Sequence, residues 1–310
     1  YEMVKQVMAL HPTSKYIHIG CDEVFHLGAC SKCSHVDTKA LFAEHVASVA
    51  RFVRSSFPGV TPLIWDDMLR RWSPADHIKW GLGDLVEPVV WVYGDDIHPL
   101  LPHFAWHAYR RTFPHVWTAG VYKGASGETA LVPDVQRHHL NTVSWLNVMK
   151  NCSRCKGFFL TGWSRYDHFA VLCELLPVAV PSLIHNLLLT SRGDTHQISK
   201  FLKCPQSMYI SLDSTSFHAQ FAKCNFPGSD MLSAVNDLAV LKSLLNALRK
   251  KTDGWISAYN IRHNFSSPMR ILDSLSETTQ LSREVIAFRK KTESVLLQYV
   301  DHFSASEWLE

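Results

Sequence analysis

Short apolar runs alternate with segments in which apolar residues recur at helical spacing throughout residues 1–204. Runs rich in β-branched and aromatic residues fit a pleated sheet and therefore predict strands. The predicted strands are 16–19, 62–65, 88–93, 115–121 and 157–161. Apolar residues at spacings of three and four predict helices between them. The predicted helices are 2–10, 37–57, 134–149 and one that begins at about residue 168.

Strands that alternate with helices predict a parallel sheet with right-handed crossovers, the arrangement of α/β proteins. Five such strands, each followed by Asp, Trp, Tyr or Lys, look like part of a (β/α)₈ TIM barrel. Five strands cannot close a barrel, so we expect an incomplete barrel whose two edges are open. From about Ser207 the pattern becomes all-helical, with apolar residues at helical spacing in 231–250 and 269–300. We therefore expect a partial barrel domain over 1–204 and a C-terminal helical extension over 205–310.

Composition narrows the class of protein. The chain has 310 residues, of which 46% are hydrophobic and 19% charged, as in an ordinary globular protein. Its formal net charge is +3 without a basic block, so we expect no nucleic-acid partner. The most apolar run, 169–189, is interrupted by Glu174, Pro177 and Pro181, so we expect no membrane partner either. Nothing in the sequence predicts the oligomeric state.

The first residue is Tyr, and no signal-peptide pattern opens the chain, so we expect a piece of a longer natural product. The chain contains eight cysteines. Several of them lie within apolar helix or strand patterns, which favours reduced thiols in a cytosolic-type compartment.

Two adjacent carboxylates, Asp22 and Glu23, follow the first predicted strand directly. In parallel α/β proteins, chemistry takes place at the C-terminal ends of the strands. Side chains alternate along a regular strand, which would send the two carboxylates to opposite faces. We therefore expect the chain to kink here, and Gly20 lowers the energetic cost of a kink.

The stretch 18–24 (His-Ile-Gly-Cys-Asp-Glu-Val) resembles the signature of the family 20 glycoside hydrolases, the β-N-acetylhexosaminidases. Three later stretches look closer still to one branch, the D-type hexosaminidases: 62–68 (Pro-Leu-Ile-Trp-Asp-Asp-Met), 122–127 (Tyr-Lys-Gly-Ala-Ser-Gly) and 160–168 (Leu-Thr-Gly-Trp-Ser-Arg-Tyr-Asp-His). The resemblance extends from Tyr1 to beyond Pro181, and more weakly to the C-terminus. It implies that the five strands are the fourth to eighth of the barrel, with the first three upstream of Tyr1.

The resemblance also implies an activity and the residues that perform it. Family 20 enzymes remove terminal N-acetylhexosamines with retention, and the substrate's own acetamido oxygen acts as the nucleophile. Glu23 would be the general acid and later the base that activates water. Asp22 would hold the acetamido N–H and stabilise the positive charge of the intermediate. The branch implies a preference for galactosamine substrates, a nuclear and cytoplasmic location, and no metal or organic cofactor.

Aromatic residues at strand ends are candidates for the walls of a sugar pocket, because flat rings bury the apolar face of a sugar well. Trp65, Trp91 and Trp163 each end a predicted strand, and His18 belongs to the signature stretch. The resemblance implies that a Tyr binds the acetamido oxygen; Tyr93 is the first candidate and Tyr122 the second.

Charged residues near the same strand ends could bind sugar hydroxyls, although each could equally be an ordinary loop charge. The candidates are Asp66, Asp67, Lys123, Arg165 and Asp167. Many family members have Glu at the position of Arg165. The resemblance therefore does not imply that this chain recognises the C4 and C6 hydroxyls of the sugar in the family's way. The Arg that the family supplies from its first strand lies outside this chain.

Two other functions fit parts of the sequence. His26, Cys30, Cys33 and His35 have zinc-ligand spacing, and Cys152 and Cys155 form a second Cys-x₂-Cys pair, so a zinc-binding protein is one alternative. The other is a non-catalytic carbohydrate-binding or interaction module on the same fold. The intact Asp22-Glu23 pair favours an enzyme.

Overall fold

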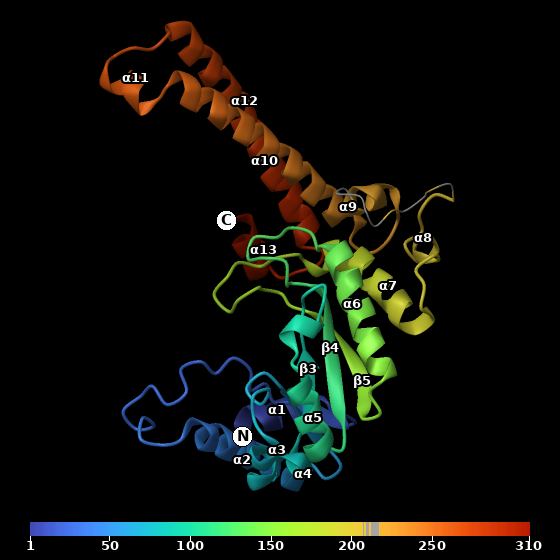
Figure 1. The fold of residues 1–310 in the computed structure, drawn as a ribbon. Helices are drawn as coiled ribbons and strands as arrows, with labels where there is room; N and C mark the ends of the chain where they lie inside the picture. Colours follow the sequence, from blue (N-terminus) through green and yellow to red (C-terminus); the bar gives the residue numbers. More distant parts are fainter. Residues whose placement is uncertain (207, 209–210, 212–216) are drawn as a thin grey trace. The chain divides into compact units, whose positions relative to one another are not determined.

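Five strands form one parallel, curled sheet in the computed structural model, which describes residues 1–206, 208, 211 and 217–310 (Figure 1). The strands are β1 (Tyr16–His18), β2 (Thr61–Trp65), β3 (Glu87–Trp91), β4 (Val116–Lys123) and β5 (Cys155–Gly162). Their spatial order equals their order in the chain, so β1 and β5 are the outer strands, as the sequence predicts. The α/β class is confirmed, and the sheet is compatible with an incomplete TIM barrel. The assignment of the strands as fourth to eighth stays a prediction.

The register of the sheet brings the C-terminal ends of the strands to one edge. Ile17 lies opposite Pro62, and Ile64 lies opposite Pro88, both in parallel pairings. Val90 continues the series opposite Thr118. Whatever follows β1, β2 and β3 in the chain is therefore presented at the same edge.

The chain divides into two compact units. Unit 1 comprises 1–121 and 137–161, and unit 2 comprises 122–136 and 162–310. The predicted boundary between 204 and 205 falls inside unit 2 and stays a prediction, while Ser207 lies outside the described residues.

The helices before β5 are α1 (Glu2–Leu10), α2 (Thr38–Ser56), α3 (Pro74–Lys79), α4 (Leu82–Leu85), η1 (His98–Leu100), α5 (His103–Thr112) and α6 (Val135–Lys150). Those after β5 are α7 (Leu176–Arg192), α8 (Ile198–Phe201), α9 (Phe217–Gln220), η2 (Phe221–Lys223), α10 (Ser229–Trp255), α11 (Ala258–Arg262), α12 (Pro268–Leu296) and α13 (His302–Leu309).

Local sequence accounts for several helix starts. The Asp37 carboxylate accepts the amide of Ala40 and caps α2. A capping box between Ser73 and Asp76 starts α3. The helix expected from about residue 168 was placed too early: α7 begins at Leu176, because Pro177 is tolerated only in its first turn. The stretch before it is a loop.

Two long helices of unit 2, α10 and α12, pack against each other as a hairpin closed by the short α11 (Figure 1). Among the described residues, the stretch Ser229–Arg262, which covers α10 and α11, is long and apolar enough to cross a membrane by length and composition alone. Core helices of soluble proteins pass the same test.

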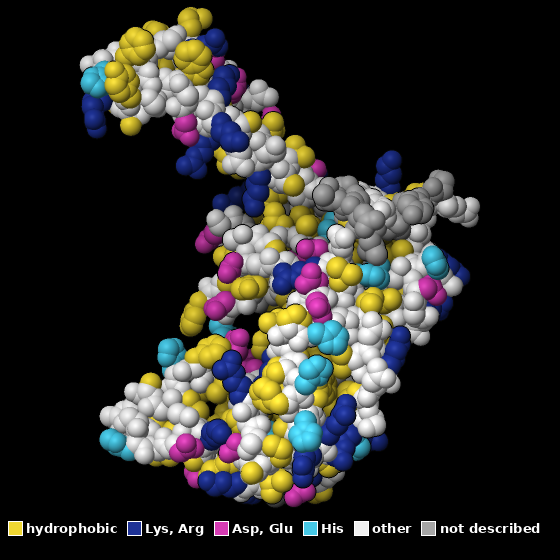
Figure 2. Space-filling model, viewed as in Figure 1, with side chains coloured by type: hydrophobic (Ala, Val, Ile, Leu, Met, Phe, Trp, Pro, Cys, Tyr) yellow, Lys and Arg dark blue, Asp and Glu magenta, His cyan; other side chains and the backbone are white. Residues whose placement is uncertain are grey.

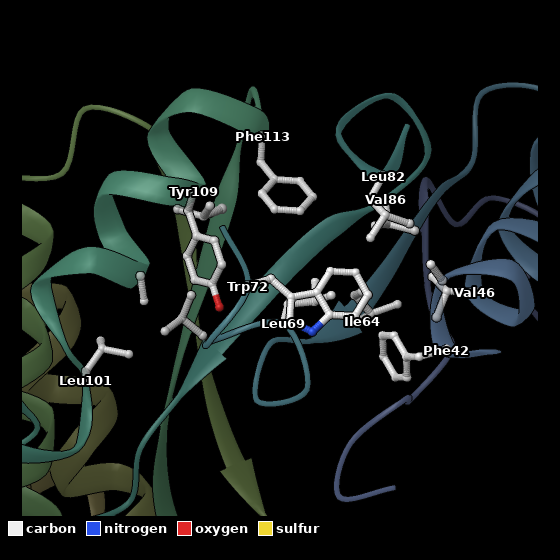
Figure 3. Packing of buried hydrophobic residues seen from close by; sticks show 14 of the residues in the cluster. Phe42, Val46, Ile64, Leu69, Trp72, Leu82, Val86, Leu101, Tyr109 and Phe113 are labelled. Carbon is white, nitrogen blue, oxygen red and sulfur yellow. The ribbon is translucent and has the colours of Figure 1, made fainter. Parts of the chain in front are cut away.

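Unit 1 is built around a helix-covered face of the sheet. Ile64 and Val90 point to this face, where they belong to one cluster with Tyr109, Phe113 and Trp145. Figure 3 shows Ile64, Tyr109 and Phe113 of this cluster. All five side chains are almost wholly buried. Burying each contributes about 1.5–3 kcal/mol or more, so this cluster holds the sheet against its helices. Unit 2 has its own core, centred on Phe221, Met231 and Leu296.

One buried side chain of this core predicts a dependence of stability on pH. His77 packs against Trp72, Tyr109 and Phe113, and its burial lowers the pKa to about 4 from 6.5. Below pH 6.5 His77 is protonated in the unfolded chain but stays neutral in the folded chain. The free energy of unfolding therefore falls as the pH falls. We expect this group alone to cost about 2 kcal/mol between pH 7 and pH 5.

Urea unfolding at pH 7 and pH 5 measures this loss. His77→Phe should reduce the difference between the two pH values, whereas the exposed His103→Phe should leave it unchanged. Equal pH dependence in wild type and His77→Phe would contradict a neutral buried imidazole.

Candidate active site

The backbone kinks sharply after β1. Gly20, Cys21 and Glu23 all have positive φ, at 76°, 76° and 51°. The carbonyl of Gly20 still accepts the amide of Trp65 at 3.0 Å, so the kinked segment stays attached to β2. The kink that the sequence predicts is confirmed, and both Asp22 and Glu23 are exposed just beyond it. Positive φ is costly for a residue with a side chain and is found where surrounding contacts enforce it.

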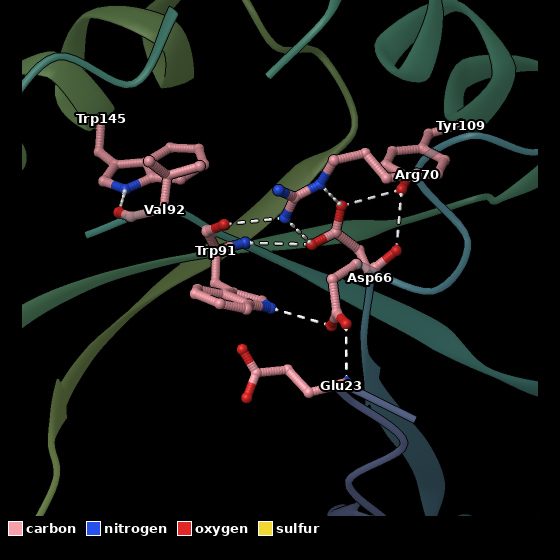
Figure 4. Close-up of polar contacts among 8 residues, drawn as sticks. Glu23, Asp66, Arg70, Trp91, Val92, Tyr109 and Trp145 are labelled. Atoms are coloured by element: carbon pink, nitrogen blue, oxygen red, sulfur yellow. Dashed lines mark hydrogen bonds and ion pairs between the residues drawn. The ribbon is translucent and has the colours of Figure 1, made fainter. Parts of the chain in front are cut away.

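One carboxylate, that of Asp67, holds the kink in place. Its Oδ2 accepts the backbone amide of Glu23 at 2.8 Å, and its Oδ1 accepts the indole Nε1–H of Trp91 at 3.1 Å. Figure 4 shows the Glu23 side chain extending on the same side as the Trp91 ring. Asp67 therefore fixes the backbone of Glu23 and the Trp91 ring relative to each other.

Its neighbour Asp66 lies in a different environment, wholly buried. Arg70 donates to both carboxylate oxygens, at 2.9 and 2.7 Å, and the Tyr109 hydroxyl donates to Oδ2 at 2.9 Å (Figure 4). The backbone amide of Trp91 donates to Oδ1 at 3.2 Å. Burial raises the pKa of Asp66, and the hydrogen bonds and charge of Arg70 oppose that shift. Asp66 thus supports the ends of β2 and β3 and exposes no surface to a ligand.

Side-chain alternation explains why two tryptophans share a face. Leu63 and Trp65 on β2, and Val89 and Trp91 on β3, are two residues apart and lie on the face opposite Ile64 and Val90. Each indole is half-buried at the end of its strand.

A second aromatic ring accompanies each of these tryptophans. The imidazole of His18 lies 4.4 Å from the Trp65 ring, centroid to centroid, and its Nδ1 accepts the amide of Gly20 at 3.1 Å. The ring of Tyr93 lies 5.0 Å from that of Trp91, although β3 ends at Trp91, two residues earlier than predicted. The predicted residues His18, Trp65, Trp91 and Tyr93 are thus paired aromatic rings along the end of the sheet.

Five other predicted residues belong to unit 2. Lys123 is buried and its Nζ donates to the carbonyl of Trp163, whose side chain is exposed. Burial lowers the pKa of Lys123. The ring of Tyr122 packs against Gly162, where a Cβ would not fit. Arg165 donates to Ala170 and forms an ion pair with Glu307 of α13, while Asp167 caps the amide of Phe169. Lys123 and Arg165 are therefore already engaged within unit 2.

Residues that sequence reasoning missed support both groups. Arg70 lies four residues after Asp66, a spacing that could have suggested the pair, whereas Tyr109 gave no signal. In unit 2 the buried Glu174 has a φ of 42° and accepts the amide of Gly124. Burial raises the pKa of Glu174, and the Gly124 amide opposes that shift. An acid inside an apolar run was the only sign of this role.

The cysteines differ from the prediction of reduced thiols. Two disulfides join Cys152 to Cys155 and Cys204 to Cys224, whereas Cys21, Cys30, Cys33 and Cys173 are free. Disulfides are typical of oxidising compartments, so the cysteines do not support the cytosolic expectation. A disulfide also takes Cys152 and Cys155 out of the zinc alternative, since only thiolates bind the metal.

His26, Cys30, Cys33 and His35 lie in the loop between β1 and α2. In the part of the chain that the structure describes, no three His, Cys, Asp or Glu side chains gather to form a metal site. The zinc alternative thus gains no support.

Known proteins supply an independent comparison. Over 321 aligned residues, 99% of this chain, it is 35% identical to hexosaminidase D from Homo sapiens. It is 40% identical over 202 residues, 62% of this chain, to hexosaminidase D from Bos taurus. The chain spans 66% and 58% of these relatives' lengths, less than two thirds of each. No protein-family profile matches it. The D-type branch is the one that the four sequence motifs resemble.

Proposed function

The chain is a hexosaminidase D-like protein, and from this premise we propose that it acts as an exo-acting retaining β-N-acetylhexosaminidase. Its substrates are glycoconjugates that end in N-acetylgalactosamine or N-acetylglucosamine, with galactosamine preferred. No metal or organic cofactor enters the reaction. The nuclear and cytoplasmic location stays a prediction from the resemblance.

In the proposed reaction the substrate's acetamido oxygen attacks the anomeric carbon while Glu23 protonates the departing glycosidic oxygen. Asp22 accepts the acetamido N–H, which orients the amide and stabilises the positive charge of the oxazolinium intermediate. Glu23, now a carboxylate, then takes a proton from water as the water attacks the same carbon. Two displacements at one carbon restore its configuration.

The observation that carries this proposal is the clamp made by Asp67. A sugar needs an acid held at a fixed position beside a flat apolar surface, because catalytic groups act only when they are placed within a fraction of an ångström. Asp67 supports such an arrangement because it accepts both the backbone amide of Glu23, from which the acid extends, and the Trp91 indole. The left-handed conformation of Glu23 supports the proposal, because such a conformation persists only where surrounding contacts enforce it.

We further propose that Trp65 and Trp91 form sugar-contacting walls and that Tyr93 binds the acetamido oxygen. His18 supports Trp65 by packing against it. Asp67 retains free lone pairs on both oxygens, so it can also accept a sugar hydroxyl. Tyr122, Trp163, Lys123 and Arg165 stay predictions from the sequence.

Hydrolysis of chromogenic N-acetyl-β-galactosaminide and N-acetyl-β-glucosaminide tests the proposal directly. Because the chain spans only part of its relatives, the assay should compare this chain with a version extended upstream. We expect the extended version to release the chromophore from both sugars, and faster from the galactosaminide. If the extended version cleaves neither sugar, the proposed activity is wrong.

A further inference from the structure

The end of the α10–α12 hairpin exposes an unusual number of large apolar side chains. We call residues 249–272 the hairpin tip; it comprises the end of α10, all of α11 and the start of α12. Six of its large side chains are between 43% and 71% exposed: Trp255, Tyr259, Ile261, Phe265, Met269 and Leu272. Figure 2 shows apolar atoms gathered at this end of the hairpin.

Exposed apolar side chains are densest at the tip, although the rest of the hairpin also exposes some, such as Val240, Leu245 and Ile286. At the opposite end of α10, Met231 and Leu232 are wholly buried in the core of unit 2. Single exposed apolar residues are ordinary, but a contiguous apolar patch on a soluble surface marks an interaction site. Six such residues among twenty-four form a patch of this kind.

Positive charge is concentrated at the same place. The tip contains five basic residues and one acidic residue, a net charge of +4, whereas the entire chain carries only +3. Arg270 lies over the ring of Trp255, with its guanidinium carbon 4.7 Å from the centroid. Lys250 and Arg262 form no ion pair with any described residue, while Lys251 pairs with Glu277. The net charge of the whole chain therefore does not reveal the positive charge of the tip.

The combination of residue types identifies the partner. Trp, Tyr and Phe beside Lys and Arg are the residues that proteins place at the boundary between lipid headgroups and hydrocarbon. Nucleic acid would account for the aromatic rings and the charge, but not for the exposed Ile261, Met269 and Leu272. A protein partner would account for the apolar residues but does not require a net charge of +4. We propose that the hairpin tip docks reversibly onto an anionic phospholipid surface.

In this arrangement the apolar side chains enter the headgroup region while the basic side chains meet lipid phosphates and carboxylates. This arrangement needs only the tip to enter the headgroup region, because Met231 and Leu232 at the other end of α10 are buried in the core of unit 2. Binding should therefore depend on both lipid charge and salt. Neither the barrel fold nor the proposed hydrolase activity enters this inference.

Cosedimentation of the full chain with vesicles tests the proposal. We expect binding to phosphatidylcholine vesicles that contain about one fifth phosphatidylserine, and binding at least about tenfold weaker to phosphatidylcholine alone. Raising the salt concentration to about 0.5 M should release the chain, because it screens the charges. No binding to either vesicle would overturn the proposal.

Two variants locate the contact. The double variant Phe265→Ser, Met269→Ser should lose most vesicle binding, whereas Ile286→Ser, on α12 beyond the tip and 66% exposed, should retain it. Circular dichroism should show the same helix content in both. Equal binding by the tip variant and wild type would overturn the proposal. The proposal would also be overturned if the wild-type chain were a dimer that does not bind vesicles and the tip variant were a monomer. A second copy of the chain would then cover the tip.

Discussion

Replacing Glu23 by Gln should lower the turnover number of the active protein about 10²–10⁴-fold, because the amide keeps the size of the side chain but cannot donate or accept the catalytic proton. The Glu23 backbone amide still reaches Asp67, so the fold of the kink should survive. Substrate affinity should change little, since Trp65 and Trp91 keep their positions. Steady-state kinetics on a chromogenic N-acetylgalactosaminide measure both quantities.

The nature of the leaving group separates an acid from a residue that merely shapes the site. An acidic leaving group, such as a nitrophenolate, needs little protonation, so kcat/KM, which does not include the later water-activation step, should fall less on it than on an alkyl glycoside. Glu44→Gln, an exposed change on α2, is the matched control and should leave the hydrolysis rates of both substrates unchanged. An equal loss on both leaving groups would argue that Glu23 is not the proton donor.

The fold was predictable because each strand combines local preference with a buried position. β-branched and aromatic residues in short runs indicated all five strands, and alternation placed Trp65 with Leu63 on one face. The start of α7 was not predictable in the same way. Residues 168–175 are as apolar as the helix that follows, so apolar spacing extended the predicted helix too far. Pro177 gave the local limit, and the bridge between Arg165 and Leu172 lies within the loop before it.

The candidate site was predictable only as far as the strand ends. Asp66 and Asp67 are neighbours, and side-chain alternation no longer applies beyond the end of β2. The sequence therefore could not show that Asp66 is buried against Arg70 while Asp67 contacts Glu23 and Trp91. Asp66 is buried because Tyr109 reaches it from a helix 43 residues away. Likewise Cys-x₂-Cys spacing is compatible with a metal site, free thiols or a disulfide, and only the three-dimensional arrangement decides among them.

Replacing Arg70 by Met should destabilise the protein by about 3–5 kcal/mol, the largest effect on stability that the structure predicts. The reason is the carboxylate left behind: Asp66 is wholly buried, and Arg70 satisfies both of its oxygens. Met retains much of the packing volume of the Arg side chain, so the cost is electrostatic rather than a cavity. Equilibrium urea unfolding at pH 7 measures it, and Arg71→Met, an exposed neighbouring change, is the control.

The pH dependence of Arg70→Met identifies the cause. Without Arg70, burial raises the pKa of Asp66 in the folded state further above its unfolded value, so the folded variant binds a proton that the unfolded chain does not. The deficit relative to wild type should therefore shrink as the pH falls from 7 towards 4. Asp66→Asn in the Arg70→Met background removes the charge and should recover part of the loss at pH 7. A deficit that is constant with pH, and not reduced by Asp66→Asn, would show that lost packing is responsible.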